Sequence, residues 1–345
     1  MARRRRIAAG TALVILVLLA VAGWWAWVRV TGPAAHFKAD SAVLFIPRGA
    51  DLDVVVDSLQ RIGAIQDETA FRWLCDRKKY TTNVKPGRYR IPDGMSMNAL
   101  VNKLRSGEQE PVRVTFNGIR RLPELAGKLG RVLEPDSLAF VRVLMDGGTQ
   151  RKAGYTPETF IAAFVPNTYE FWWTTTPEQF LERMGKEHAR FWSAERKAKA
   201  AELDLSPVEV VTLASIVQAE TVKRTDAPRI AGVYLNRLRI GMPLQADPTL
   251  KFALGLDSIS RVLNADKEVV SPYNTYKNLG LPPGPINMPE TSMIDAVLDA
   301  EGHDYLYFCA RADLSGYSDF SRSYEQHLVN ARKYQRALNQ RGIFR

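Results

Sequence analysis

The pattern of apolar and polar positions opens with a long uncharged run at residues 7–28. As a helix, these residues would extend about 33 Å, enough to cross the hydrocarbon core of a bilayer. Four arginines precede the run and the tryptophan-rich segment "GWWAWV" ends it, which predicts a cytoplasmic tail at residues 1–6, a transmembrane helix at 7–28 and a body outside the cytoplasm. A cleaved signal peptide is the alternative, because "AVA" at 20–22 fits a cleavage site, but the apolar run is longer than such peptides need.

Residues 43–110 show shorter strand-like and helix-like patterns after a linker at 29–42. The apolar segments "VLFI" and "GRYRI" predict two strands. Apolar positions at helical spacing predict helices from Asp51 to Arg61, from Glu68 to Lys78 and at 95–107. A strand, two helices and a strand within about 50 residues predict a small α+β module, well below the usual domain size.

Two further regions follow, a middle region at 111–203 and a C-terminal region at 204–345. The middle region opens with the strand-like "VRVTF" and ends in the charged helical segment "SAERKAKAAELDL". Between them lie Trp172 and Trp173, which could stack on sugar rings but, with no partner identified, are expected to pack against the protein. The predicted fold class is α+β, with a mostly helical C-terminal region edged by short strands.

One helix of the C-terminal region carries an acid in an apolar position. The capping-box segment "SPVE" predicts that this helix starts at Ser206. One stripe of the helix is formed by Val210, Leu213, Val217 and Glu220. Burial on this stripe and the negative end of the helix both disfavour a charged carboxylate, so a raised pKa is predicted for Glu220, as a general acid requires. The alternative is a structural ion pair with Arg224, Arg229 or Arg237.

The segments after this helix carry further candidate side chains. A second helix is predicted to begin near Thr225 or Asp226, with Asn236 and Arg237 off its apolar stripe, where they could face a cleft or solvent. The turn around Pro248 offers Gln245, Asp247 and Thr249, and the proline-rich loop at 271–285 offers Tyr273, Asn274 and Tyr276. Aromatic and amide groups on a stiff loop suit carbohydrate binding, and the alternative is a loop that only covers a core.

Composition and charge narrow the possible partners. The net charge of +10 includes five arginines within residues 1–30, which leaves 42 basic and 37 acidic side chains in the rest of the chain. This small excess suits an anionic wall or lipid surface, or a merely solvated one, and no zinc-finger, aromatic RNA-binding or basic-helix pattern points to nucleic acid. Cys75 and Cys309 lie in apolar segments and fit buried hydrophobes better than a disulfide, and the four histidines lack metal-ligand spacing.

Several consecutive segments resemble one known family. "LASIVQAET", "YLNRLRIGMPLQADPT", "SPYNTYKNLGLPPGPINMP" and "SYEQHL" closely resemble the MltG (YceG-like) endolytic murein transglycosylases. The segments "FIPRGADLDVVVDSLQRIGAI" and "GRYRI" look like the LysM-like subdomain of that family. The resemblance covers nearly the whole chain and implies a LysM-like subdomain at 43–110 and a catalytic domain at 204–345.

The resemblance also implies roles for individual residues. The catalytic glutamate of the "ASIV..ET" helix matches Glu220. By the same matching, the glycan-binding residues would be Asn236, Arg237, Gln245, Asp247, Tyr273, Asn274 and Tyr276, to which we add Thr249 from the turn. Three positions depart from the family pattern: Asn167 replaces an acid, Ser318 stands where histidine is common, and Gln326 where glutamate is usual.

The resemblance implies cleavage of the β-1,4 bond between N-acetylmuramic acid and N-acetylglucosamine in nascent strands, with a 1,6-anhydro end as product and strand elongation terminated. It implies no cofactor or metal, and as partners peptidoglycan glycan strands, the inner membrane, penicillin-binding proteins and other wall synthases. Two alternatives stay open. One is a hydrolytic muramidase that uses Asp247 as a second carboxylate. The other is a non-catalytic, membrane-anchored scaffold that binds glycan and recruits wall synthases.

Overall fold

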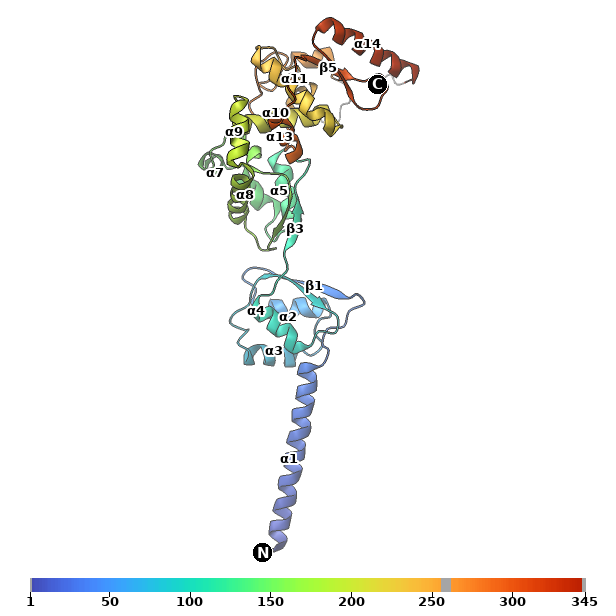
Figure 1. The fold of residues 1–345 in the computed structure, drawn as a ribbon. Helices are drawn as coiled ribbons and strands as arrows, with labels where there is room; N and C mark the ends of the chain where they lie inside the picture. The colour runs from blue at the N-terminus through green and yellow to red at the C-terminus, as the bar shows by residue number, and fades with distance from the viewer. Residues whose placement is uncertain (1, 256–261, 343–345) are drawn as a thin grey trace. The chain divides into compact units, whose positions relative to one another are not determined.

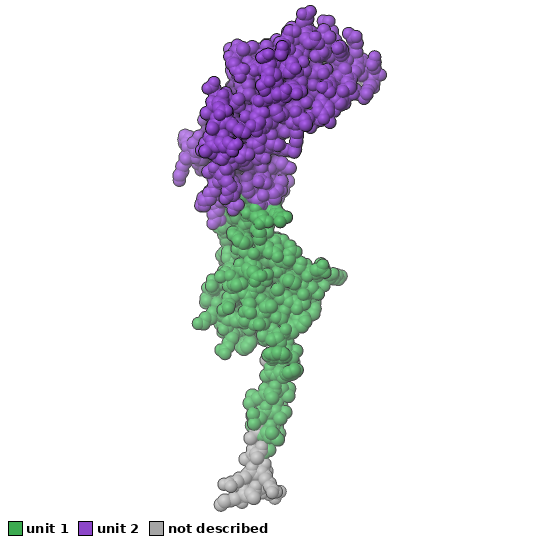
Figure 2. Space-filling model, in the orientation of Figure 1, with its two compact units in different colours: residues 1–113, 132–135, 170–176 green, residues 114–131, 136–169, 177–345 purple. Residues whose placement is uncertain are grey.

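The computed structural model describes residues 2–255 and 262–342, which form two compact units (Figures 1 and 2). Unit 1 comprises Met1–Arg113, Val132–Pro135 and Glu170–Thr176, and unit 2 comprises Val114–Arg131, Asp136–Tyr169 and Pro177–Arg345. The α+β class is confirmed, because helices alternate with three separate two-stranded sheets, β1–β2, β3–β4 and β5–β6. The predicted regions 111–203 and 204–345 lie mostly within the same unit.

Unit 1 begins with helix α1 (Ala2–Thr31), drawn as the long blue ribbon of Figure 1. Its segment Leu13–Thr31 is long and apolar enough to cross a membrane, and none of that segment is buried. The helix extends beyond the predicted span at both ends. Near its end, Arg29 forms an ion pair with Asp67 at 2.6 Å.

The rest of unit 1 contains the predicted strand, two helices and strand, followed by a third helix. The elements are β1 (Ser41–Ile46), α2 (Leu52–Arg61), α3 (Glu68–Arg77), β2 (Gly87–Pro92) and α4 (Met97–Ser106). β1 and β2 pair in antiparallel register with Leu44 opposite Tyr89, and both side chains are buried in the core of the unit. α4 ends at Gly107, whose φ of 75° favours glycine. Each predicted element of this module is therefore confirmed to within two residues.

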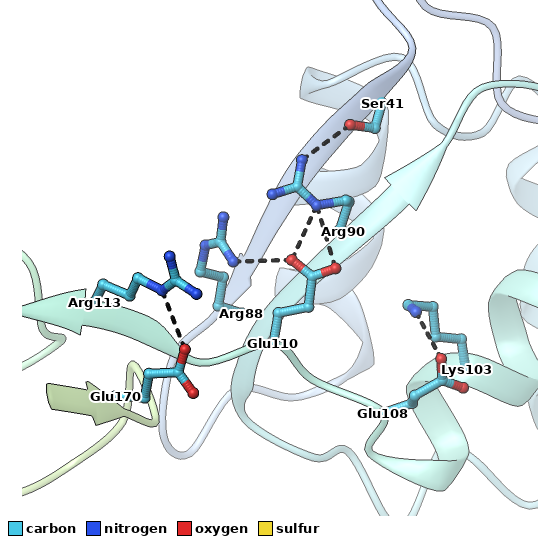
Figure 3. A network of polar contacts seen from close by, with 8 residues as sticks. All are labelled: Ser41, Arg88, Arg90, Lys103, Glu108, Glu110, Arg113 and Glu170. Atoms are coloured by element: carbon cyan, nitrogen blue, oxygen red, sulfur yellow. Dashed lines mark hydrogen bonds and ion pairs between the residues drawn. The ribbon is translucent and has the colours of Figure 1, made fainter.

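Arginines of β2 contact a glutamate of the segment that comes after α4 (Figure 3). Glu110 accepts hydrogen bonds from Arg88 at 3.1 Å and from Arg90 at 2.9 Å. Next to them, Arg113 in β3 (Val112–Thr115) pairs with Glu170 in β4 (Thr168–Phe171) at 3.1 Å. Because the side chains of Arg113 and Glu170 are both more than half exposed, that pair contributes little to stability.

Unit 2 is mostly helical. Its helices are α5 (Leu122–Gly130), α6 (Ser137–Leu144), α7 (Gly147–Lys152), η1 (Phe160–Ala163), α8 (Pro177–Phe191), α9 (Ala194–Glu202), α10 (Pro207–Glu220), η2 (Arg224–Asp226), α11 (Ala227–Arg239), α12 (Asp247–Leu254), η3 (Asn264–Glu268), α13 (Thr291–Leu298) and α14 (Tyr324–Gln340). Its C-terminal strands, β5 (Tyr307–Ala310) and β6 (Ser318–Ser321), pair in antiparallel register. α14 packs beside β5 and β6 (Figure 1).

The core of unit 2 surrounds α10. Every residue from Val210 to Val217 is buried, and α11 and α13 pack against the helix. The predicted single apolar stripe was therefore too narrow, because neighbouring elements cover the helix on all sides. The flank of α10 is also tied to the segment before α13: Ser215 Oγ accepts a hydrogen bond from the backbone N–H of Ile286 at 3.0 Å, and Gln218 Oε1 accepts one from that of Glu290 at 2.6 Å.

The tryptophan and cysteine predictions have mixed outcomes. Trp173 packs on Phe45 with ring centroids 5.0 Å apart, as predicted, but Trp172 is 50% exposed, so the packing prediction is wrong for that residue. Both cysteines are free. Cys75 is buried, and burial raises the pKa of its thiol to about 12, which makes it an unreactive core residue. Cys309 is only half-buried.

Candidate active site

Glu220 is the last residue of α10 and lies where the core reaches the surface. The helix starts as predicted, because Ser206 Oγ accepts a hydrogen bond from the backbone of Glu209 and the Glu209 carboxylate accepts one from the backbone of Ser206. It ends because Thr221 adopts an extended conformation with φ −136°. Val222 is already 87% exposed, whereas the side chain of Glu220 stays half-buried.

The Glu220 carboxyl is held by a buried phenol. Tyr234 of α11, only 1% exposed, donates a hydrogen bond to Glu220 Oε1 at 2.9 Å. Burial raises the pKa of Glu220 to about 7, although the Tyr234 hydrogen bond acts in the opposite direction. The predicted direction of this pKa shift is confirmed.

Charged neighbours modulate the same pKa. The negative charge of Asp247 raises the pKa of Glu220, and the positive charges of Lys251 and Arg237 lower it. The effects of the negative and the positive neighbours on the pKa partly cancel. Burial is the largest cause of the shift. The carboxyl can therefore exchange its proton near neutral pH, which is the property a general acid and base needs.

The alternative prediction of an ion pair for Glu220 is not what the structure contains. Arg224 binds Glu290, and Arg229 binds Glu301 at 2.9 Å. Arg237 donates to backbone carbonyls instead of to a carboxylate. Each of the three predicted arginines therefore has its partner elsewhere.

Arg237 and Asn236 connect α11 to the strands that follow. Arg237 Nε donates to the backbone oxygen of Leu306 at 2.7 Å and Nη1 to that of Leu244 at 2.6 Å. Arg237 is only 7% exposed, so the prediction that it faces a cleft or solvent was wrong; satisfied guanidinium donors allow its burial. The Asn236 amide likewise donates to the backbone oxygens of His303 and Tyr305, at 2.7 and 3.1 Å.

Two predicted loop residues meet beside the carboxyl. Tyr276 donates a hydrogen bond from its hydroxyl to Asp247 Oδ1 at 2.6 Å. The charge of Asp247 raises the pKa of Glu220, and the charges of Asp247 and Glu220 raise the pKa of Tyr276. Asp247 is exposed and Tyr276 is half-buried. Gln245 is also exposed, with φ 50°, and its backbone N–H donates to Thr275 at 3.0 Å. The structure thus brings Glu220, Asp247 and Tyr276 together, with Gln245 on the adjoining turn.

The other predicted loop residues shape these segments. Thr249 and Asn274 are fully buried. Thr249 bonds to Ala246 and Thr275, while the Asn274 amide donates to the backbone oxygens of Lys267 and Val269, both at 2.8 Å. Tyr273 is half-buried and packs on Phe252, with ring centroids 4.8 Å apart. Burial of these groups favours a supporting role over direct contact with a ligand.

Sequence reasoning missed two neighbours of Glu220, Tyr234 and Lys251. By helical spacing Tyr234 falls on the apolar face of its helix, but a buried phenol needs a hydrogen-bond partner, and that need was the available signal. Lys251 lies on α12, a helix that the sequence pattern did not predict. Its influence on Glu220 follows from the tertiary fold alone.

Replacing Tyr234 with phenylalanine tests the electrostatic description of Glu220. The substitution removes a hydrogen bond that favours the charged carboxylate and keeps the ring, so the pKa of Glu220 should rise by about one further unit. Carbon-13 NMR of labelled glutamate side chains in the full chain would follow this titration. Tyr273→Phe, which changes a tyrosine packed on Phe252, is the matched control. A Glu220 pKa that stays the same or falls in Tyr234→Phe would contradict the description.

A separate cavity lies at the other end of α10. It has a volume of about 760 Å³ and is lined by residues that include Leu203, Ser206, Leu238 and Pro283. The lining reaches along the helix from Ser206 to Thr212, whereas Glu220 ends the helix, so about 12 Å of helix separates this cavity from the carboxyl. The cavity is therefore distinct from the candidate site around Glu220.

Comparisons with known proteins agree over most of the chain. A family model described as the YceG-like family matches residues 44–333. A Bacillus subtilis protein named endolytic murein transglycosylase is 29% identical over 315 residues, which cover 86% of this chain and 85% of that protein. Streptococcus pneumoniae proteins of the same name are 28% identical over 343 residues, and the match spans only 60% of their length. The crystal structure of a yceG-like protein from Listeria monocytogenes is 28% identical, has a TM-score of 0.56, and matches over 84% of this chain and 98% of that one.

Proposed function

Because the chain belongs to the YceG-like family, we propose that it is an endolytic murein transglycosylase that cleaves peptidoglycan glycan strands, with Glu220 as its catalytic acid and base. The observation that carries the assignment of Glu220 is a half-buried carboxyl at the end of a core helix, with a pKa of about 7 and a hydrogen bond from a buried tyrosine. Such a group is able both to give and to take a proton at neutral pH.

In the proposed reaction, Glu220 begins protonated and donates its proton to the oxygen that joins N-acetylmuramic acid to N-acetylglucosamine. The bond from C1 of the muramic acid to that oxygen breaks. The C6 hydroxyl of the same muramic acid then bonds to C1, and its proton returns to the Glu220 carboxylate. The product carries a 1,6-anhydro ring, no water is consumed, and the carboxyl is regenerated in its starting form.

This route explains how one carboxyl can suffice. Glycoside hydrolysis usually needs two carboxylates, because a water or an enzyme nucleophile must be positioned as well. Here the nucleophile belongs to the substrate. Tyr234 keeps Oε1 of Glu220 in place and stabilises the carboxylate that forms after the first proton transfer.

The predicted binding residues divide into two groups in this proposal. Gln245, Asp247 and Tyr276 are solvent-accessible near Glu220 and are proposed to contact the glycan. The second group is proposed to hold the walls of the site in position and comprises Asn236, Arg237, Thr249, Tyr273 and Asn274. No metal or cofactor takes part in this route.

The location of the protein is part of the proposal. One apolar N-terminal helix is present, and we propose that it is a retained single-pass anchor in the inner membrane, with residues 1–6 in the cytoplasm and the catalytic unit outside it. The module at 43–110 is proposed to be LysM-like. Penicillin-binding proteins and other wall synthases are proposed partners, and strand termination is the proposed role.

Mass spectrometry of the reaction products tests the proposed function. The full chain in detergent micelles, incubated with nascent uncrosslinked glycan strands, should release fragments with anhydro ends, which are one water lighter than reducing ends. If the parent chain instead released fragments with reducing ends, and Asp247→Asn released none, the protein would be a hydrolytic muramidase. Glycan binding without any product would identify a scaffold.

A further inference from the structure

Three aromatic side chains gather where α14 meets β5. Tyr307 of β5 lies 5.5 Å from His327 and 5.7 Å from Tyr324, measured between ring centroids, and Tyr324 lies 6.1 Å from His327. The His327 ring is inclined by only 27° to Tyr307 and by 28° to Tyr324. We call these three residues the aromatic shelf. The predicted glycan-binding set does not include them.

The aromatic shelf is open to solvent at Tyr324. That side chain is 59% exposed, while Tyr307 and His327 are half-buried. No described residue of α14 is buried, so Tyr324 is not an anchor of the hydrophobic core. Burial and the charge of Arg237 lower the pKa of His327, which favours its neutral imidazole. The shelf therefore presents an exposed, uncharged aromatic surface.

Arg237 and Tyr234 place the aromatic shelf beside Glu220. Tyr234, which holds the Glu220 carboxyl, and Arg237 are three residues apart on α11 and so share one face of that helix. The Arg237 guanidinium lies 5.3 Å from the centre of the Tyr307 ring. Behind it, Tyr234 packs edge-to-face on Phe308, the neighbour of Tyr307 in β5, at 5.8 Å.

Two kinds of side chain adjoin the residues around the carboxyl. Asp247 and Tyr276 are polar and come from the loops. The aromatic shelf adjoins Arg237, whose charge also acts on Glu220. A chain of sugar rings bound at Glu220 must extend away from it in both directions, because the cut is made within a strand.

We propose that the aromatic shelf is a sugar-binding subsite, on which a pyranose ring of the glycan strand stacks against Tyr324. This inference rests on the proposed function, which supplies the ligand class. One face of a pyranose carries mainly C–H groups, and an aromatic face matches it without the need to bury charge. Neutral N-acetylated sugars suit an uncharged shelf. Binding there would hold the strand while Glu220 acts on a neighbouring bond.

Binding measured without cleavage tests the subsite. The full chain with Glu220→Gln, in detergent micelles, is titrated with chitohexaose by calorimetry, so that affinity is measured apart from cutting. Adding Tyr324→Ala should weaken the affinity about tenfold, the amount expected for loss of one aromatic stacking contact. Tyr324→Phe keeps the ring and should bind as the parent does. Tyr334→Ala removes a tyrosine ten residues further along α14 and serves as the matched control.

The results separate the subsite from the reaction. An unchanged affinity in Tyr324→Ala, an equal loss in Tyr334→Ala, or no binding of chitohexaose by the parent would each overturn the subsite. In the chain with Glu220 intact, Tyr324→Ala should raise KM about tenfold and leave kcat nearly unchanged. A chain that binds chitohexaose through Tyr324 but releases no anhydro product would retain the subsite and refute the proposed function.

Discussion

The Glu220→Gln chain is expected to release no detectable anhydro product from glycan strands. Glutamine preserves the shape of the side chain and can still accept the Tyr234 hydrogen bond, but it cannot donate and recover a proton. A general acid or base typically contributes about 10²- to 10⁴-fold to a rate. Glu220 acts in both steps of the proposed reaction, so a loss of at least about 10³-fold is expected.

Product release should be followed by mass spectrometry under conditions in which the parent chain digests its substrate completely. Asp247→Asn is the matched control, because it removes the neighbouring carboxylate and leaves Glu220 intact. It should retain anhydro products with an altered pH dependence. Anhydro product from Glu220→Gln at the parental rate would remove Glu220 from the mechanism. A far-UV spectrum showing that this variant is unfolded would contradict the expectation that the substitution preserves the fold.

The same substitution should stabilise the protein at alkaline pH. In the folded chain the pKa of Glu220 is about 7, against about 4.5 for an unperturbed glutamate. A raised pKa means that stability is full below pH 4.5, where both states hold the proton, and declines as pH rises through 7. The decline amounts to about 3 kcal/mol of unfolding free energy at most, since each pKa unit corresponds to about 1.4 kcal/mol. Glutamine has no such dependence.

Urea unfolding followed by near-ultraviolet circular dichroism would compare the two chains at pH 4.5 and pH 8. The midpoints should agree at pH 4.5, and Glu220→Gln should unfold at higher urea at pH 8. Glu178→Gln, a change at an exposed position of α8, should show no difference that depends on pH. If Glu220→Gln were equally or less stable than the parent at pH 8, burial of the charged Glu220 carboxylate would not destabilise the folded chain as expected.

The bounds of α10 and the position of Glu220 could be predicted from residues close together in the sequence. The start of α10 follows from Ser206 and its capping partner three residues later, and the end of the helix places Glu220 at the edge of an apolar segment. These features require no knowledge of distant contacts. The direction of the Glu220 pKa shift could therefore be predicted before its neighbours were known.

The missed features depend on distant parts of the chain. Arg237 is polar by type, yet it is buried because backbone carbonyls 7 and 69 residues away accept its hydrogen bonds. The aromatic shelf similarly joins a strand to the first turn of the last helix. Periodicity reports which face of one element is apolar and carries no information about which elements meet. The neighbours of Glu220 could not be predicted for that reason.

The ties between α10 and the segment at 286–290 have a consequence for variation in this protein. Ser215 and Gln218 fasten the helix by its flank, so the position of its terminal carboxyl is inherited from the assembly of the core. Tolerated substitutions should therefore accumulate on exposed turns such as the one that carries Gln245 and Asp247, and spare the interior of the helix. Homologues could then diverge in which wall polymer they accept while keeping a single proton-transfer geometry.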